Sequence, residues 1–300
     1  MSYLQRGNSK KPRSEFGSFH PTLNFLYFVT VITCSVRFQH PIFLGISFLS
    51  SFLQSVLFGK KSIAFYLFCF LIFPIYTSWY ALYHHFGITN IGTTWIGNHF
   101  TLEAFVYGAV RALVVIIVLF WFSYLYAIFS SDKLIYLFGK AAPKFSLYLA
   151  IIFRTASRVQ EKFYKINEAQ SGIGRGIKQG NILMRIKNFF RIISILITWM
   201  LDSFGEASDS MKSRGYSLKG RTAFSIYYFG NRDRLFTIFF FFLLTIVWMG
   251  DVLGQTEVLY NPEIVWGPVS SVSYLFYIAY TILCIQPLII EVYVKIHIKQ

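Results

Sequence analysis

The sequence is poor in acidic residues and in cysteine. It contains 13 aspartates and glutamates against 28 lysines and arginines, which gives a formal net charge of +15. The three cysteines lie far apart, each within an apolar run, and none belongs to a Cys-x-x-Cys pair: Cys34, Cys69 and Cys284. Cysteines placed in this way act as small buried hydrophobic residues, and neither a disulfide framework nor a structural zinc site is indicated.

The sequence also lacks the motifs of common catalytic and nucleotide-binding sites. It has no Gly-x-x-x-x-Gly-Lys-Ser/Thr loop, because the nearest run, residues 59–62, lacks the upstream glycine. His-Glu-x-x-His and Gly-x-Ser-x-Gly are absent as well. We expect Glu161 and Glu168 to balance Arg158 and Lys165 on one helix instead of forming an acid–base pair. The sequence therefore predicts a protein that is not an enzyme and has no cofactor or metal site.

Apolar and aromatic residues, by contrast, are abundant. They make up 55% and 20% of the chain, and the mean hydropathy is +0.52. A soluble fold could not bury so much apolar surface, so the composition predicts an integral membrane protein. The positive charge comes without any groove-reading motif, so we predict no nucleic-acid partner and attribute the charge to the positive-inside rule.

A membrane helix needs ~20 mostly apolar residues to cross a hydrocarbon core of ~30 Å. We predict an all-α integral membrane protein with about six spans. The first two are short and are separated by residues 37–41, so they form either a tight helical hairpin or two tilted spans. The predicted spans are Leu23–Val36, Ile42–Phe58, Ser62–Tyr83, Ala104–Ser130, Leu235–Gly250 and Ser271–Ile290.

The loops between these spans alternate in charge. Eighteen of the 28 lysines and arginines lie in residues 132–234, whereas residues 84–102 and 251–270 contain none. The positive-inside rule then places both termini and the basic segment in the cytoplasm, with Arg37 as one tolerated exception. We also expect Arg111, inside the fourth span, to pair with a neighbouring helix, since a charge at that depth is costly.

This charge pattern predicts three parts in the chain. Residues 1–131 hold four spans, residues 132–234 form a cytoplasmic helical module, and residues 235–300 hold two spans. In the module, one long amphipathic helix is predicted from Pro143 to about Gln170 and a second from about Asn181 to Ser213. The apolar stripe of the second helix is Ile186, Phe190, Ile193, Ile197, Met200, Phe204, Ala207 and Met211.

Both long helices end in glycine with an arginine nearby. The residues concerned are Gly174, Arg175 and Gly176 after the first helix, and Ser213, Arg214 and Gly215 after the second. An arginine held at a helix end is preset for a bidentate contact with a carboxylate on a partner. Two such ends suit a partner with two similar halves. The alternative is that both arginines are solvated charges near lipid head groups that complement the helix dipoles.

The second of these ends carries a recognisable run. Residues 210–222, SMKSRGYSLKGRT, resemble the second coupling motif of the T component of energy-coupling factor (ECF) transporters, the EcfT/CbiQ family, with Ser213 in place of the usual alanine. The resemblance is collinear over residues 19–234. It also includes Phe19-His20-Pro21, Ser131-Asp132-Lys133-Leu134 and Glu168-Ala169-Gln170.

The resemblance implies a non-catalytic subunit of an ATP-driven importer in a bacterial cell membrane. Its long coupling helices cross and dock into two ATPase subunits, a homodimer or a heterodimer. A small membrane-embedded S component captures the vitamin or transition-metal ion. In the family, Arg-Gly follows Glu-Ala-Gln after two residues, but those places here are Ile173 and Gly174. Either the arginine has shifted to Arg175, or this end docks without the usual ion pair.

Two other readings remain. In an ordinary ABC importer permease, the Glu-Ala-Ala-x-x-x-Gly coupling loop would correspond to residues 168–174. The long helix after that loop and the second Arg-Gly motif disfavour this class. A membrane enzyme or a scaffold unrelated to transport is the third class, and the sequence offers no catalytic constellation for it.

Overall fold

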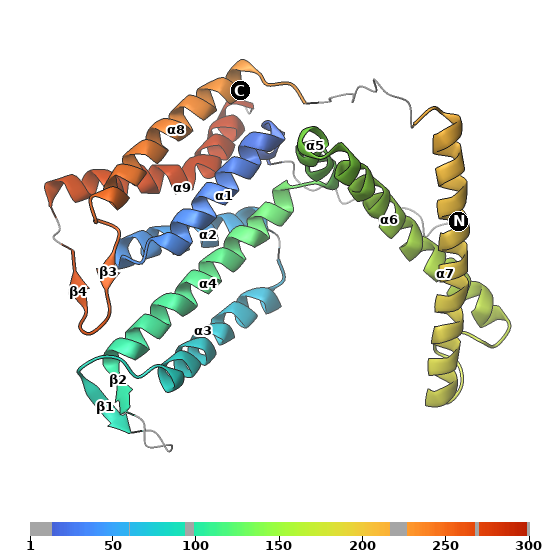
Figure 1. Ribbon diagram of the computed structural model, residues 1–300, viewed down its shortest axis with the longest axis horizontal. Coiled ribbons are helices and arrows are strands. Elements are labelled where there is room, and N and C mark those ends of the chain that lie inside the picture. Colours follow the sequence, from blue (N-terminus) through green and yellow to red (C-terminus); the bar gives the residue numbers. More distant parts are fainter. Residues whose placement is uncertain (1–13, 60, 94–98, 217–226, 268–269, 299–300) are drawn as a thin grey trace. The chain divides into compact units, whose positions relative to one another are not determined.

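The chain is built mainly of helices and divides into two compact units (Figure 1). The computed structural model describes residues 14–59, 61–93, 99–216, 227–267 and 270–298. The bundle unit joins Met1–Ser130 to Tyr227–Gln300, and the long-helix unit is Ser131–Ile226. The two C-terminal helices therefore pack with the N-terminal ones in a single unit.

The bundle unit contains the membrane-length helices. Within the described residues, five helices are long and apolar enough to cross a bilayer, so the chain is an all-α, multi-pass membrane protein, as predicted. The helices of this unit are α1 (Pro21–Arg37), α2 (Pro41–Phe58), α3 (Ile63–Tyr83), α4 (Leu102–Ile128), α8 (Asn231–Val252) and α9 (Ser271–Ile298), preceded by the short 3-10 turn η1 (Phe16–Ser18).

Helix α1 is the shorter of the two short helices that the sequence predicts near the N-terminal end of the chain. It has 17 residues, one fewer than α2, so at 1.5 Å per residue both helices are slightly shorter than the ~30 Å of a hydrocarbon core. One face of α1 packs into the interior, where Tyr27, Phe28 and Val31 are fully buried, while other apolar side chains such as Val29 are exposed. The structure thus supports five membrane-length helices, with α1 packed among them.

Helices α1 and α2 begin in the same way. Each starts with a proline directly after a histidine, and the histidine ring accepts a hydrogen bond from the first turn. His20 Nδ1 accepts from Thr22 N–H and His40 Nδ1 from Ile42 N–H, both at 3.4 Å. Proline fits this position because a backbone N–H in the first turn has no acceptor within the helix, so its absence costs no hydrogen bond. The predicted place of Pro41 in the first turn of the second helix is confirmed.

The core of the bundle unit lies around α4. This helix contacts α1, α2 and α3, while α9 contacts α2 and α8. Trp121 is fully buried and its ring lies 6.2 Å from that of Tyr27 and 6.4 Å from that of Phe28. Many large apolar side chains on the surface of the bundle are exposed, such as Phe70 at 78%. Helices that face lipid are expected to expose such side chains.

Two short antiparallel hairpins were not predicted. Strands β1 (Asn90–Thr93) and β2 (His99–Thr101) follow α3, and strands β3 (Val258–Leu259) and β4 (Val265–Trp266) follow α8. The first hairpin is fixed to α4 by Glu103, whose Oε1 accepts from the N–H of Thr89 at 3.2 Å and from its hydroxyl at 2.5 Å. Strands of two to four residues are too short to show a reliable alternation of apolar and polar residues in the sequence.

The long-helix unit contains α5 (Ser131–Ala141), α6 (Pro143–Gly172) and α7 (Ile182–Ser213). Helix α5 packs on α6, where the hydroxyl of Ser146 donates to the carbonyl of Ile135 at 2.9 Å. Helices α6 and α7 are in contact and inclined to one another (Figure 1). At this contact the ammonium of Lys162 lies 5.2 Å from the ring centre of Trp199.

The face of α7 buried in this unit is not the predicted apolar stripe. Buried residues of α7 are Asn188, Ile192 and Leu196, which recur every four positions. Most of the predicted stripe is exposed; Phe190, for example, is 65% exposed. The difference arises because α7 has apolar residues on more than one face, so periodicity alone does not choose which face meets α6. An apolar face of α7 is left without a covering element among the described residues of this unit.

Candidate docking site at the ends of two long helices

Helix α6 ends in a Schellman motif closed by Gly174. The N–H of Arg175 donates to the carbonyl of Gln170 at 2.8 Å, and the N–H of Gly174 donates to that of Ser171 at 3.1 Å. Gly174 has φ +77°, a left-handed conformation that glycine adopts without steric cost. The helix therefore stops at a defined residue, and the carbonyls of Gln170 and Ser171 accept hydrogen bonds from the residues that follow.

Helix α7 ends in the same motif, closed by Gly215. The N–H of Tyr216 donates to the carbonyl of Met211 at 3.1 Å, and the N–H of Gly215 donates to that of Lys212 at 3.0 Å. Gly215 has φ +71°. Arg214 is the C-cap residue directly before the left-handed glycine. The prediction that Gly215 ends the second long helix is thus confirmed, with the glycine one position beyond the C-cap residue.

These hydrogen bonds define which residues of the two ends are equivalent. Gly174 matches Gly215, so the C-cap position of α6 is Ile173 where α7 has Arg214. Arg175 matches Tyr216 and lies beyond the turn. The first Arg-Gly pair is therefore not the structural counterpart of the second. Gly174, which closes α6, is preceded by Ile173. This is the position where the resemblance described above would place an arginine.

The predicted site residues differ in exposure. Ser213, Arg214 and Arg175 are exposed, whereas Gly176 is buried. A Cβ on Gly176 would lie 2.2 Å from Ser171 Oγ and 3.1 Å from Ser171 Cα, so a larger residue there would force the turn after α6 to shift. Across the residues that the structure describes, Arg214 forms no ion pair. Residues 217–222 of the second motif lie outside the described residues.

Amide side chains tie the turn between α6 and α7, and sequence reasoning missed them. Gln179 Oε1 accepts from Gly176 N–H at 2.9 Å, and Gln179 Nε2 donates to the carbonyl of Ser171 at 3.1 Å. Asn188 Nδ2 donates to the carbonyl of Gly176 at 3.1 Å, and Asn167 Oδ1 accepts from the N–H of residue 177 at 3.2 Å. Amides in this role have no sequence signature, because many polar side chains of the long-helix unit could form such hydrogen bonds. They tie the end of α6 to the turn that follows it and to the first part of α7.

Glu161 Oε1 accepts from Lys165 Nζ at 2.6 Å, four residues later, as expected for a balancing pair. The hydrogen bond from Lys165 lowers the pKa of Glu161. Both side chains are well exposed, so this pair contributes little to stability. Within the described residues, no three metal-ligating side chains gather at one place.

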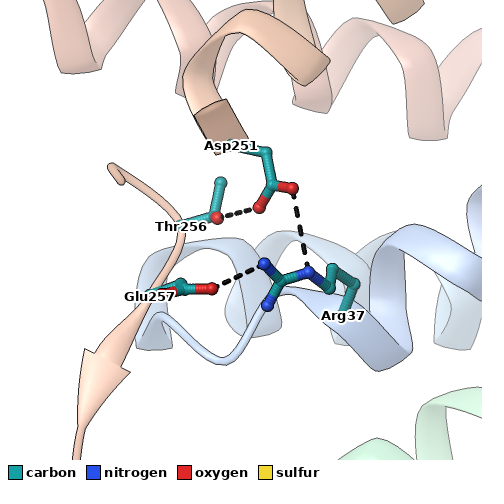
Figure 2. Close-up of polar contacts among 4 residues, drawn as sticks. All are labelled: Arg37, Asp251, Thr256 and Glu257. Carbon is teal, nitrogen blue, oxygen red and sulfur yellow. Dashed lines mark hydrogen bonds and ion pairs between the residues drawn. The ribbon is translucent and has the colours of Figure 1, made fainter. Parts of the chain in front are cut away.

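In the bundle unit, Arg37 has two acidic partners (Figure 2). Its Nη2 lies 2.6 Å from Glu257 Oε1 and its Nε lies 3.8 Å from Asp251 Oδ2. The hydroxyl of Thr256 donates to Asp251 and fixes that carboxylate. Arg37 was the one cation that did not follow the predicted charge alternation. Its charge is offset by two carboxylates, one near the end of α8 and one directly before β3.

Arg111 finds its partner on its own helix. Its Nε donates to the hydroxyl of Tyr107 at 2.9 Å, and the guanidinium carbon lies 4.9 Å from the centre of that ring. The expected pairing with a neighbouring helix is replaced by this contact one turn earlier on α4. Tyr107 reaches other elements in turn, since its ring lies 5.5 Å from Tyr80 on α3 and 5.2 Å from Tyr260 near β3. The arginine is therefore anchored indirectly to two other parts of the bundle.

No protein family matches the chain in a comparison with family models, and no curated protein matches it.

Proposed function

We propose that this protein is the transmembrane energy-coupling subunit of an ECF-type importer. The observation that carries the proposal is the end of α7, where Arg214 is exposed at a hydrogen-bonded helix terminus and forms no ion pair with the described residues. A guanidinium held in this way is available for a carboxylate on a soluble partner. The membrane-length helices supply the anchor from which such a contact would act.

In this proposal the long-helix unit transmits motion. ATP binding and hydrolysis move two ATPase subunits, and these subunits hold the ends of α6 and α7. A helix of 32 residues, the length of α7, is a rod of ~48 Å. The turn after α6 is braced by Gln179 and Asn188, so displacement of one rod would be passed to the other. The S component, which captures the vitamin or transition-metal ion, would reorient in response.

The sidedness is part of the proposal. Both termini and the long-helix unit lie in the cytoplasm of a bacterial cell, and residues 84–102 and 251–270 lie outside, as the positive-inside rule assigns them. The contacts of Arg37 support this arrangement, because its charge is offset by Asp251 and Glu257. The basic residues before position 14, and those at positions 60 and 299, lie outside the described residues.

Purification of the full chain in a gentle detergent tests the assignment. We expect two ATPase chains with the Gly-x-x-x-x-Gly-Lys-Ser/Thr motif to co-purify, together with one small membrane protein. Mass spectrometry identifies each by its peptides. ATPases without a small membrane protein would support an ordinary ABC permease, for which residues 168–174 would be the coupling loop. Purification without any ATPase would overturn the proposal.

Cysteine labelling tests the sidedness. Lys187 on α7 and Glu263 before β4 are both exposed, and the three native cysteines are buried. A membrane-impermeant maleimide should label Glu263→Cys in intact cells and should label Lys187→Cys only after the cells are permeabilised. Labelling of Lys187→Cys in intact cells would place the long-helix unit outside the cell, where no ATPase could bind it.

A further inference from the structure

A groove runs between α1 and the second half of α8 in the bundle unit. Its volume is about 440 Å³, which lies within the ~300–1,000 Å³ of small-molecule sites. Among its lining residues, Cys34 and Phe38 are buried, whereas Val29 and Trp248 are exposed. Trp248 stands one turn before the end of α8, and tryptophan is enriched in membrane proteins at the level of the lipid headgroups. The groove therefore opens toward lipid.

One end of this groove is charged, and the chemistry changes along its length. Arg37 and Asp251 line the charged end, and Glu257 lies 2.6 Å from Arg37 Nη2 (Figure 2). Thr33 and Thr30 also line the groove, four and seven residues before Arg37 on α1. Their hydroxyls are thus ~6 and ~10 Å further along the helix axis. Charges, then hydroxyls, then apolar side chains follow the order of headgroup, glycerol esters and acyl chain in a phospholipid.

From this order we propose that the groove binds one phospholipid whose zwitterionic headgroup ends in a primary ammonium, as in phosphatidylethanolamine. The phosphate accepts from Arg37, which has five N–H donors and, among the described residues, only the Glu257 carboxylate within hydrogen-bond distance. The ammonium donates to Asp251 and Glu257. The acyl chain lies along Val29 and Leu244, which line the apolar part of the groove.

The charges select this headgroup against others. One guanidinium and two carboxylates leave a net charge of about −1, so the anionic headgroup of phosphatidylglycerol brings a further anion and no cation to offset it. The quaternary ammonium of phosphatidylcholine has no N–H to donate to the carboxylates. A helix of another membrane protein could cover the apolar part, but its contact would desolvate the three charges at the end.

Lipid titration followed by native mass spectrometry tests the selectivity. The full chain is delipidated in detergent, and phosphatidylethanolamine, phosphatidylcholine and phosphatidylglycerol are added separately. We expect one phosphatidylethanolamine to be retained at a concentration about fivefold lower than the other two lipids require, the size expected for an exposed charge pair. Equal retention of the three lipids would contradict the proposal.

Two variants connect the preference to the charged end. Glu257→Gln removes one carboxylate and should reduce the preference for phosphatidylethanolamine to about twofold or less. Glu263→Gln is the matched control, because it makes the same change at an exposed residue six positions later that does not line the groove. We expect it to keep the preference. A full preference in Glu257→Gln, or the same loss in both variants, would show that the headgroup does not bind as proposed.

The unaltered chain gives a second test in membranes. A phosphatidylethanolamine with a diazirine in its acyl chain is added to membranes that contain the full chain, and the cross-linked peptides are sequenced. We expect cross-links in residues 29–38 and 244–251 to exceed those in α3, which also exposes large apolar side chains. Even labelling of all exposed helices would mean that the groove is no specific site. Labelling of the groove in the purified chain but not in membranes would mean that another protein fills it, and the proposal would be wrong.

Discussion

The Arg214→Glu variant is expected to lose at least about tenfold in affinity for the ATPase subunits and to lose substrate uptake. Truncating one member of a buried interfacial charge pair costs about 2–5 kcal/mol, and charge reversal adds repulsion. The change should leave the bundle unit intact, because Arg214 is exposed and belongs to the other compact unit. Binding of purified ATPase to the solubilised variant measures the effect.

Lys187→Glu is the matched control for this variant. It makes the same change of charge on the same helix, at an exposed position 27 residues before Arg214. That separation corresponds to ~40 Å along a helix, so the control keeps the overall electrostatic attraction comparable and spares the helix end. We expect near-normal capture by Lys187→Glu. Similar losses in both variants would show that general positive charge, and not the end of α7, binds the ATPase.

The ends of the long helices were accessible to sequence reasoning because glycine has a specific backbone role. The glycine after Arg214 was assigned as the terminus of the second helix, and its positive φ explains why. For the first helix, three glycines stand at positions 172, 174 and 176. The pattern could not say which of them would adopt the left-handed conformation. Only the hydrogen bonds select Gly174 and thereby place Ile173, not Arg175, at the C-cap.

Contacts between distant parts of the chain could not be predicted from the sequence. Arg37 is separated from its partner Glu257 by most of the sequence, and no local pattern joins them. For α7, the sequence correctly predicted a long helix, but the buried face is the one with Asn188 and Ile192. Which apolar face is buried depends on where α6 crosses, and that is decided by the turn between the helices. Membrane-length runs were the easiest to predict, because length and hydropathy are local properties.

Close packing of α3 against α4 gives the second large expected effect. Gly108 on α4 is buried, and a Cβ placed there would lie 3.1 Å from both the carbonyl oxygen of Thr77 and Cβ of Tyr80 on α3. Ala104 and Ala112 stand four residues to either side and are fully buried, so small residues line one face of α4. Between membrane helices, such small residues permit the close approach that favours association. Gly108→Leu should therefore force α3 away from α4.

We expect Gly108→Leu to lower the stability of the bundle by about 3 kcal/mol or more, at the upper end of overpacking costs. For a unit of this size that corresponds to a fall of about 6–12 °C in the thermal midpoint, measured by unfolding in detergent. Gly45→Leu on α2 is the matched control, because nothing lies within 4 Å of a Cβ placed there. It exchanges the same residues within a membrane-length helix and should change the midpoint little. An equal fall in both variants would mean that losing a helical glycine matters and that the α3–α4 contact does not. A fall confined to Gly108→Leu would assign the loss to that contact, since only there does the added side chain meet the backbone of a neighbouring helix.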